Sequence, residues 1–163
     1  MGPQLLSERD NYVDYLDSRR EAFARKCEGL APEQLATRSV PPSTMSLLGM
    51  IRHLGEVERI WFRRWLVGEG DPGRLYGPRG ADVDWDGAVA DQALVDEAWT
   101  NWRDEVAFSK EWLAAHDDMD ATVDCDHHGV LNVRDIVVHM IEEYAQHLGH
   151  ADLLREAIDG QKG

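Results

Sequence analysis

Four long segments of this chain place apolar residues three or four positions apart, which is the spacing of one face of an α-helix. The pattern predicts helices over roughly Ser7–Glu28, Met45–Val67, Asp91–Ala115 and Asn132–Ile158. Strand patterns are nearly absent, because only Ala121–Val123 has one and no partner for it is evident. A helix of about 20 residues is about 30 Å long, so we predict an all-α four-helix bundle.

Residues at the ends of these segments agree with the predicted boundaries. Ser7 and Asn132 can cap helix N-termini, and Gly160 is typical of the residue that follows a helix. Prolines interrupt the first connector, where we expect only a short helical turn at Pro32–Leu35. The segment Glu69–Gly87 is rich in glycine, proline and aspartate, and we expect a long surface loop there.

Length and charge narrow the class of protein. The 163 residues favour a single domain over residues 1–163, and the net charge of −14 offers no basic surface for phosphates. The two cysteines, Cys27 and Cys125, make no disulfide framework, and the first residues lack a signal-peptide pattern. No apolar run reaches the ~20 residues of a membrane span. We therefore expect a cytoplasmic protein that binds neither nucleic acid nor membrane.

The fourth helical segment carries a carboxylate and an imidazole on its buried side. Glu143 and His147 are four residues apart, so their side chains can meet one turn apart on the helix. His53 lies on the shoulder of the apolar stripe of the second segment. Two imidazoles and one carboxylate can bind a divalent metal and leave a position open, as in catalytic zinc sites. Metal binding would also remove the cost of burying these groups unpaired.

The spacing alone leaves other interpretations open. A histidine near an apolar face is commonly a hydrogen-bonded core residue, and His139 forms an equivalent pair with Glu143. The loop Cys125–His128 could also bind a metal, although a solvated loop is the simpler interpretation. Asp82, Asp84 and Asp86 alternate with apolar residues, but this stretch lacks the glycine and the glutamate of an EF-hand.

Three residues are candidates for a supporting shell around the metal. Glu58 lies within the second-segment stripe and could orient His53, or it could form an ion pair between helices with Arg155. His150 and Tyr144 lie on the same helix as the predicted carboxylate ligand, and either could support the site.

Three stretches make the sequence similar to a known family. KCEGL at Lys26–Leu30, the run from Pro41 to Glu69, and the run from His139 to Gly160 resemble the DinB-like superfamily, in particular its actinobacterial branch. The resemblance implies a DinB/YfiT-like four-helix bundle with up-up-down-down topology and long crossovers. It also implies a divalent metal, most often zinc or nickel, near one end of the bundle.

The resemblance also implies a site and an activity. A His, Glu, His metal set is similar to that of the metal-binding domain of mycothiol-dependent maleylpyruvate isomerases, and it carries over onto His53, Glu143 and His147. The family includes S-transferases in which a metal-bound thiolate from mycothiol, bacillithiol or glutathione attacks a small electrophile. We therefore expect a homodimeric, mycothiol-type thiol S-transferase. The alternatives are a non-enzymatic metal-binding stress or sensing bundle and a metal-dependent hydrolase.

Overall fold

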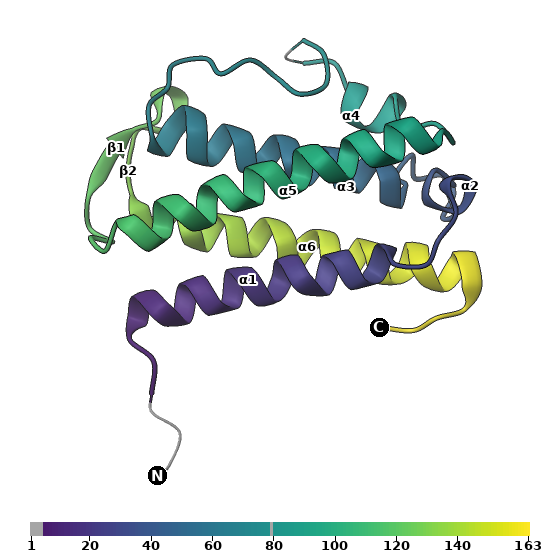
Figure 1. Cartoon of the computed structure of the whole chain (residues 1–163), viewed down its shortest axis with the longest axis horizontal. Helices are drawn as coiled ribbons and strands as arrows, with labels where there is room; N and C mark the ends of the chain where they lie inside the picture. The colour runs from purple at the N-terminus through teal and green to yellow at the C-terminus, as the bar shows by residue number, and fades with distance from the viewer. Residues whose placement is uncertain (1–4, 79) are drawn as a thin grey trace.

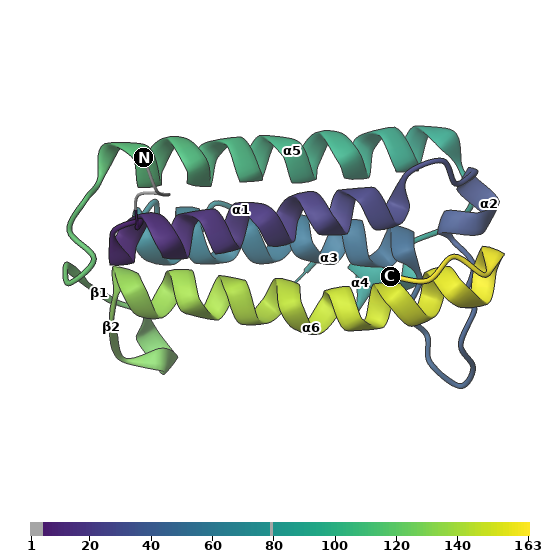
Figure 2. The same cartoon turned by 90° about the horizontal axis from the view of Figure 1, so that it is seen from below.

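A computed structural model describes residues 5–78 and 80–163, apart from the side chain of His127. Four long helices lie side by side in it (Figures 1 and 2). They are α1 (Glu8–Cys27), α3 (Leu47–Glu58), α5 (Gln92–Ala115) and α6 (Val133–Asp159). Helix α3 continues without a break into a π-helical segment, η1 (Arg59–Leu66). The prediction of an all-α four-helix bundle is confirmed.

The order of helix directions differs from the expected up-up-down-down topology. Helices α1 and α6 are parallel, since Arg134 pairs with Glu8 near their starts and Arg155 donates to the carbonyl of Lys26 near their ends. Helices α3 and α5 are parallel to each other and run the opposite way, which gives up-down-down-up (Figure 1).

Only the second connector crosses the length of the bundle, whereas the expected topology has two crossovers. Residues 67–91 run from the end of η1 back to the start of α5, and a chain of this length easily exceeds the ~30 Å of a 20-residue helix. The first connector folds locally into the short helix α2 (Pro32–Leu35), as predicted, and so stays at one end.

The third connector stays at the other end because it folds into a hairpin. Strand β1 (Thr122–Asp124) pairs antiparallel with β2 (Val130–Asn132), and the 3₁₀ turn η2 (Asp126–His128) lies between them. The pattern at Ala121–Val123 indicates the first strand, but the sequence does not indicate its partner, which is only three residues long and directly precedes α6.

Helix boundaries follow the predicted capping residues. The hydroxyl of Ser7 accepts a hydrogen bond from the backbone N–H of Asp10 at the start of α1. Asn132 and Asp135 bond each other's backbone N–H groups at the start of α6. Helix α6 ends at Gly160, whose φ of 78° is a left-handed conformation that glycine adopts without strain.

A buried polar network ties the four long helices together at the centre of the bundle. Arg20 of α1 donates two hydrogen bonds of 2.8 Å to the carboxylate of Glu58 on α3. Tyr144 of α6 donates to Glu58 at 2.8 Å and accepts from the indole of Trp102 on α5 at 2.9 Å. Burial, together with the charge of Glu58, raises the pKa of Tyr144 well above its usual value, so the hydroxyl stays a donor.

This network corrects one prediction. Glu58 does form an ion pair between helices, but its partner is Arg20, not Arg155. Arg155 instead donates to the backbone carbonyls of Lys26 and Glu28, because it lies near the far end of α6. Among the described residues, no helix is long and apolar enough to cross a membrane.

Candidate metal centre

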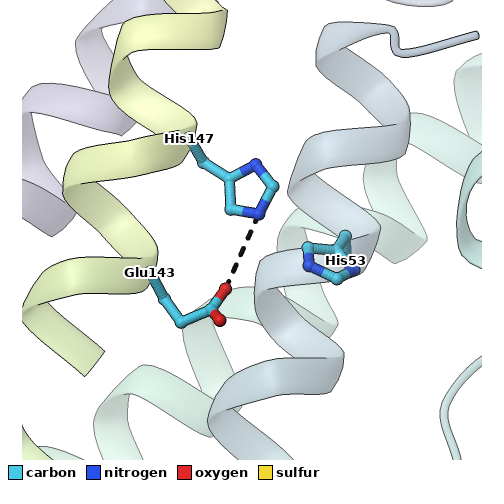
Figure 3. A group of neighbouring side chains, drawn as sticks. All are labelled: His53, Glu143 and His147. Atoms are coloured by element: carbon cyan, nitrogen blue, oxygen red, sulfur yellow. Dashed lines mark ion pairs between the residues drawn. The ribbon is translucent and has the colours of Figure 1, made fainter. Parts of the chain in front are cut away.

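His53, Glu143 and His147 converge between α3 and α6 (Figure 3). Each offers one ligand atom, and these three atoms all lie within 4.8 Å of one another. The Nε2 atom of His147 is 3.6 Å from Oε2 of Glu143, and the centres of the His53 and His147 rings are 4.9 Å apart. The structure therefore brings together the three residues singled out in the sequence, and they form a possible metal site.

Asp84 contacts the Nδ1 atom of the His53 imidazole. This contact was not predicted from the sequence. Nδ1 of His53 lies 2.9 Å from Oδ2 of Asp84, so the carboxylate accepts the Nδ1–H and leaves Nε2 for a ligand. Burial would raise the pKa of the Asp84 carboxyl, but the hydrogen bond and charge of His53 outweigh burial and hold this pKa below its usual value.

Asp84 reaches the site because a short helix, α4 (Val83–Asp86), forms inside the predicted loop. Arg52 of α3 donates to the carbonyl oxygens of Val83 and Asp84 at 3.0 and 2.9 Å, which fixes this helix against α3. Trp85 packs against the His53 ring, with 5.0 Å between ring centres. The alternation of Asp82, Asp84 and Asp86 with apolar residues is the sequence signal at this position, but by itself it does not indicate a contact with His53.

The backbone of α4 approaches α3 closely because α3 has glycine at position 49. A Cβ atom built on Gly49 would lie only 2.7 Å from the ring of Trp85. This position therefore selects glycine for space, not for backbone conformation. Gly49 and Trp85 together let Asp84 approach His53.

The donor set fits a divalent transition metal. Nε2 is the His147 nitrogen that faces Glu143, and among the described residues neither this atom nor Nε2 of His53 makes a hydrogen bond. The interaction with His147, together with the charges of neighbouring histidines, holds the pKa of Glu143 below its usual value, so this carboxyl is ionised near neutral pH. Two imidazole nitrogens and one carboxylate oxygen are ligands that zinc and nickel accept.

The predicted supporting residues have different roles in the structure. Both oxygens of Glu58 are bonded within the buried network, and Nδ1 of His53 is taken by Asp84, so Glu58 does not orient His53. Tyr144 belongs to the same network. His150 does adjoin the site, with its ring centre 5.5 Å from that of His147, and burial lowers its pKa.

The loop Cys125–His128 does not form a second metal site among the described residues. Cys125 is fully buried, and burial raises the pKa of its thiol, which disfavours the thiolate that binds metals. The ring of His128 instead packs against Trp61, with 5.2 Å between ring centres. The side chain of His127 lies outside the described part of the chain.

Fold and site together define a DinB-like helical bundle with a His, Glu, His group that could hold a divalent metal. Residues 11–160 match the model of a family described as Mycothiol-S-transferase. This match covers well over half of the chain, so the protein belongs to the mycothiol-S-transferase family, and the predicted DinB-like relationship is confirmed.

A solved structure supports the fold. It is a conserved protein from Enterococcus faecalis, which superposes with a TM-score of 0.71 over 96% of this chain and 100% of its own. At 14% sequence identity, this likeness concerns the fold alone. No functionally curated protein matches the chain.

Proposed function

We propose that this protein is a metal-dependent S-transferase that joins mycothiol to small electrophiles. The observation that carries the proposal is the convergence of His53, Glu143 and His147 within the segment that matches the mycothiol-S-transferase family. A divalent metal bound by these three residues would stabilise the thiolate form of a coordinated thiol and lower its pKa toward neutrality. Zinc is the proposed metal and nickel the alternative.

The chain's own residues have separate parts in this proposal. His53 and His147 present neutral imidazole nitrogens from two facing helices, and Glu143 adds one negative charge. Asp84 fixes the ring orientation of His53, so the donor atoms are arranged before any ligand binds. The new bond joins the thiol sulfur to the electrophilic carbon, while the leaving group departs and the thiol proton passes to solvent.

Charge supports mycothiol over thiols that carry free carboxylates. The chain has a net charge of −14, and Asp84 and Glu143 would together offset the charge of a divalent metal, so the site would present no excess positive charge within an acidic protein. Mycothiol is a sugar-linked cysteine derivative without a carboxylate, whereas glutathione has two. Repulsion between like charges therefore disfavours glutathione at this site.

The test uses purified protein, mycothiol and monochlorobimane, which becomes fluorescent when a thiol displaces its chloride. We expect conjugation that a chelator abolishes and that added Zn²⁺ or Ni²⁺ restores. Mycothiol should give a higher kcat/KM than glutathione or bacillithiol. If no thiol is conjugated faster than in the absence of protein, the transferase proposal is wrong. Metal that still binds in that case would leave the non-enzymatic metal-binding alternative.

The ligand assignment needs its own test by elemental analysis. His147→Ala and Glu143→Ala should each lose metal during purification, whereas His116→Ala, at the remote end of α5, should retain it. We also propose that the protein is a homodimer in the cytoplasm, where low-molecular-weight thiols are kept reduced. Sedimentation of the purified protein checks the dimer.

A further inference from the structure

The π-helical segment η1 contacts α6. Its backbone is wider than an α-helix, as the hydrogen bond from the N–H of Val67 to the carbonyl of Phe62 shows, at 2.9 Å and five residues apart. Phe62 and Leu66 stay in the core, whereas Trp61 is only partly buried at its edge. π-Helical turns are rare and often occur at functional sites, which makes the contacts of Trp61 of interest.

Trp61 packs against His139 of α6. The two ring centres are 4.2 Å apart and the ring planes are inclined by 47°. His139 lies one helical turn before Glu143, on the side of the carboxylate away from His147. Trp61 therefore contacts His139, one of the two imidazoles on α6 that the proposed metal set does not use.

The carboxylate of Glu143 lies between two imidazoles. Its Oε2 atom is 3.6 Å from Nε2 of His147, and its Oε1 atom is 3.5 Å from Nε2 of His139. If the oxygen on the His147 side binds the metal, the other oxygen faces His139. Carboxylates that bind metals are commonly held by a second contact of this kind, which fixes their orientation.

We propose that His139, held in place by Trp61, is a positioning residue that keeps Glu143 bound to the metal through a single oxygen. This inference rests on the metal site of the proposed function. His139 acts as an N–H donor to the free oxygen and does not touch the metal. A carboxylate without this contact could turn and bind through both oxygens, which would occupy the position needed by the thiol.

In this proposal His53 and Glu143 are supported by the same two kinds of contact. The carboxylate of Asp84 contacts Nδ1 of His53, and Trp85, the next residue in the sequence, packs on the His53 ring. The imidazole of His139 lies near Oε1 of Glu143, and Trp61 packs on the His139 ring. Each of these ligands is thus held by one polar side chain and one indole, and a ligand held in this way keeps its orientation when the metal exchanges.

The test measures the binding of Zn²⁺ and Co²⁺ alone, without thiol or electrophile. We expect His139→Leu to weaken Zn²⁺ binding about tenfold in competition with a chromogenic chelator. The visible spectrum of bound Co²⁺ should also change, because this spectrum reports the number and geometry of ligands. His139→Gln retains an N–H donor and should keep most of the affinity and the wild-type spectrum. Trp61→Leu should shift both measurements in the same direction as His139→Leu.

The chain offers a matched control pair far from the site. Trp112 and His116 stack at 4.0 Å with nearly parallel rings near the end of α5. Trp112→Leu and His116→Leu should leave Zn²⁺ affinity and the Co²⁺ spectrum unchanged. Wild-type affinity and spectrum in His139→Leu would overturn the positioning role while leaving the metal site intact. A wild-type protein that binds neither ion would overturn both this role and the proposed function.

Discussion

Nδ1 of His53 lies 2.9 Å from the carboxylate of Asp84, and these two residues come from elements that are 31 positions apart in the sequence. One lies on a long bundle helix, and the other lies on a four-residue helix within the crossover. A carboxylate that accepts the Nδ1–H selects the tautomer with Nε2 free and raises the basicity of that nitrogen. The crossover is therefore part of the site as well as a connection.

The first prediction concerns this contact. Asp84→Ala should lower the affinity for Zn²⁺ by about 10- to 100-fold, because the His53 ring loses the group that orients it. Asp84→Asn can still accept a hydrogen bond and should lose less. Competition with a chelator of known affinity measures both effects.

Asp86→Asn is the matched control for Asp84. Asp86 belongs to the same short helix and, within residues 5–78 and 80–163, its carboxylate forms an ion pair only with the exposed Arg38, at 3.2 Å. This variant should bind Zn²⁺ as tightly as the wild type. An equal loss in both variants would mean that α4 as a whole was disturbed, and the specific role of Asp84 would then be wrong.

The second prediction gives the pH dependence of the same contact in metal-free protein. The pKa of Asp84 is lowered in the folded state, so the folded protein binds this proton less tightly than the unfolded chain does. The stabilisation is therefore present above the ordinary aspartate pKa of about 3.9 and is lost as the pH falls through the lowered value.

Denaturant unfolding of metal-free wild type and Asp84→Asn at several pH values measures this loss. The difference in the free energy of unfolding between the two proteins should shrink below about pH 4, since the amide resembles the protonated carboxyl. A difference that grows in acid would contradict the assigned direction of the pKa shift.

The third prediction concerns the buried network at the centre of the bundle. Glu58→Ala removes the partner of Arg20 and the acceptor of the Tyr144 hydroxyl, both of which are buried. Removing one member of a buried ion pair costs about 3–5 kcal/mol, a large part of the stability of a domain, and since Arg20 keeps a contact of 2.9 Å with the partly buried Asp17 we expect the lower end of this range. Thermal unfolding of the metal-free protein should show a large loss.

Glu21→Ala provides the comparison on the surface. Glu21 lies 3.9 Å from Arg25, and both side chains are mostly exposed. Solvent screens such a pair, so this variant should unfold close to the wild-type midpoint. Similar midpoints for Glu58→Ala and Glu21→Ala would show that the central network does not stabilise the bundle.

The helices and the three converging residues could be predicted because their signals are local and repeated. Capping residues and a stripe of apolar side chains recur in each long helix, and Glu143 and His147 are fixed relative to each other by helix geometry alone. His53 lies at the edge of the apolar face of α3, and this position indicated that α3 supplies the third ligand. The family resemblance agreed with this set and favoured His147 over His139 as the partner of Glu143.

The parts that were missed depend on contacts between distant segments. Helix α4 has four residues, too few for a periodic pattern, and it is fixed by Arg52 from another helix. The partner of Glu58 could not be chosen from spacing, since Arg20 and Arg155 both lie on amphipathic helices. The helix directions depend on which connector is extended, which helix periodicity does not indicate, and the up-up-down-down order implied by the family resemblance was wrong.

The last prediction compares one substitution at two helical glycines. Gly49→Ala would place a Cβ atom 2.7 Å from the ring of Trp85, and the rigid indole must move to make room. Overpacking of this kind costs about 1–3 kcal/mol. Because Trp85 adjoins Asp84, the variant should also bind Zn²⁺ more weakly.

Gly149→Ala should have the opposite effect on stability. Gly149 lies within α6, is exposed, and would place its Cβ atom with nothing within 4 Å. Alanine favours a helix over glycine by up to about 1 kcal/mol, so the thermal midpoint should rise. Zn²⁺ affinity should stay unchanged in this variant. If instead Gly49→Ala is as stable as Gly149→Ala and binds Zn²⁺ equally well, then α4 does not need the close approach to α3, and Asp84 reaches His53 for another reason.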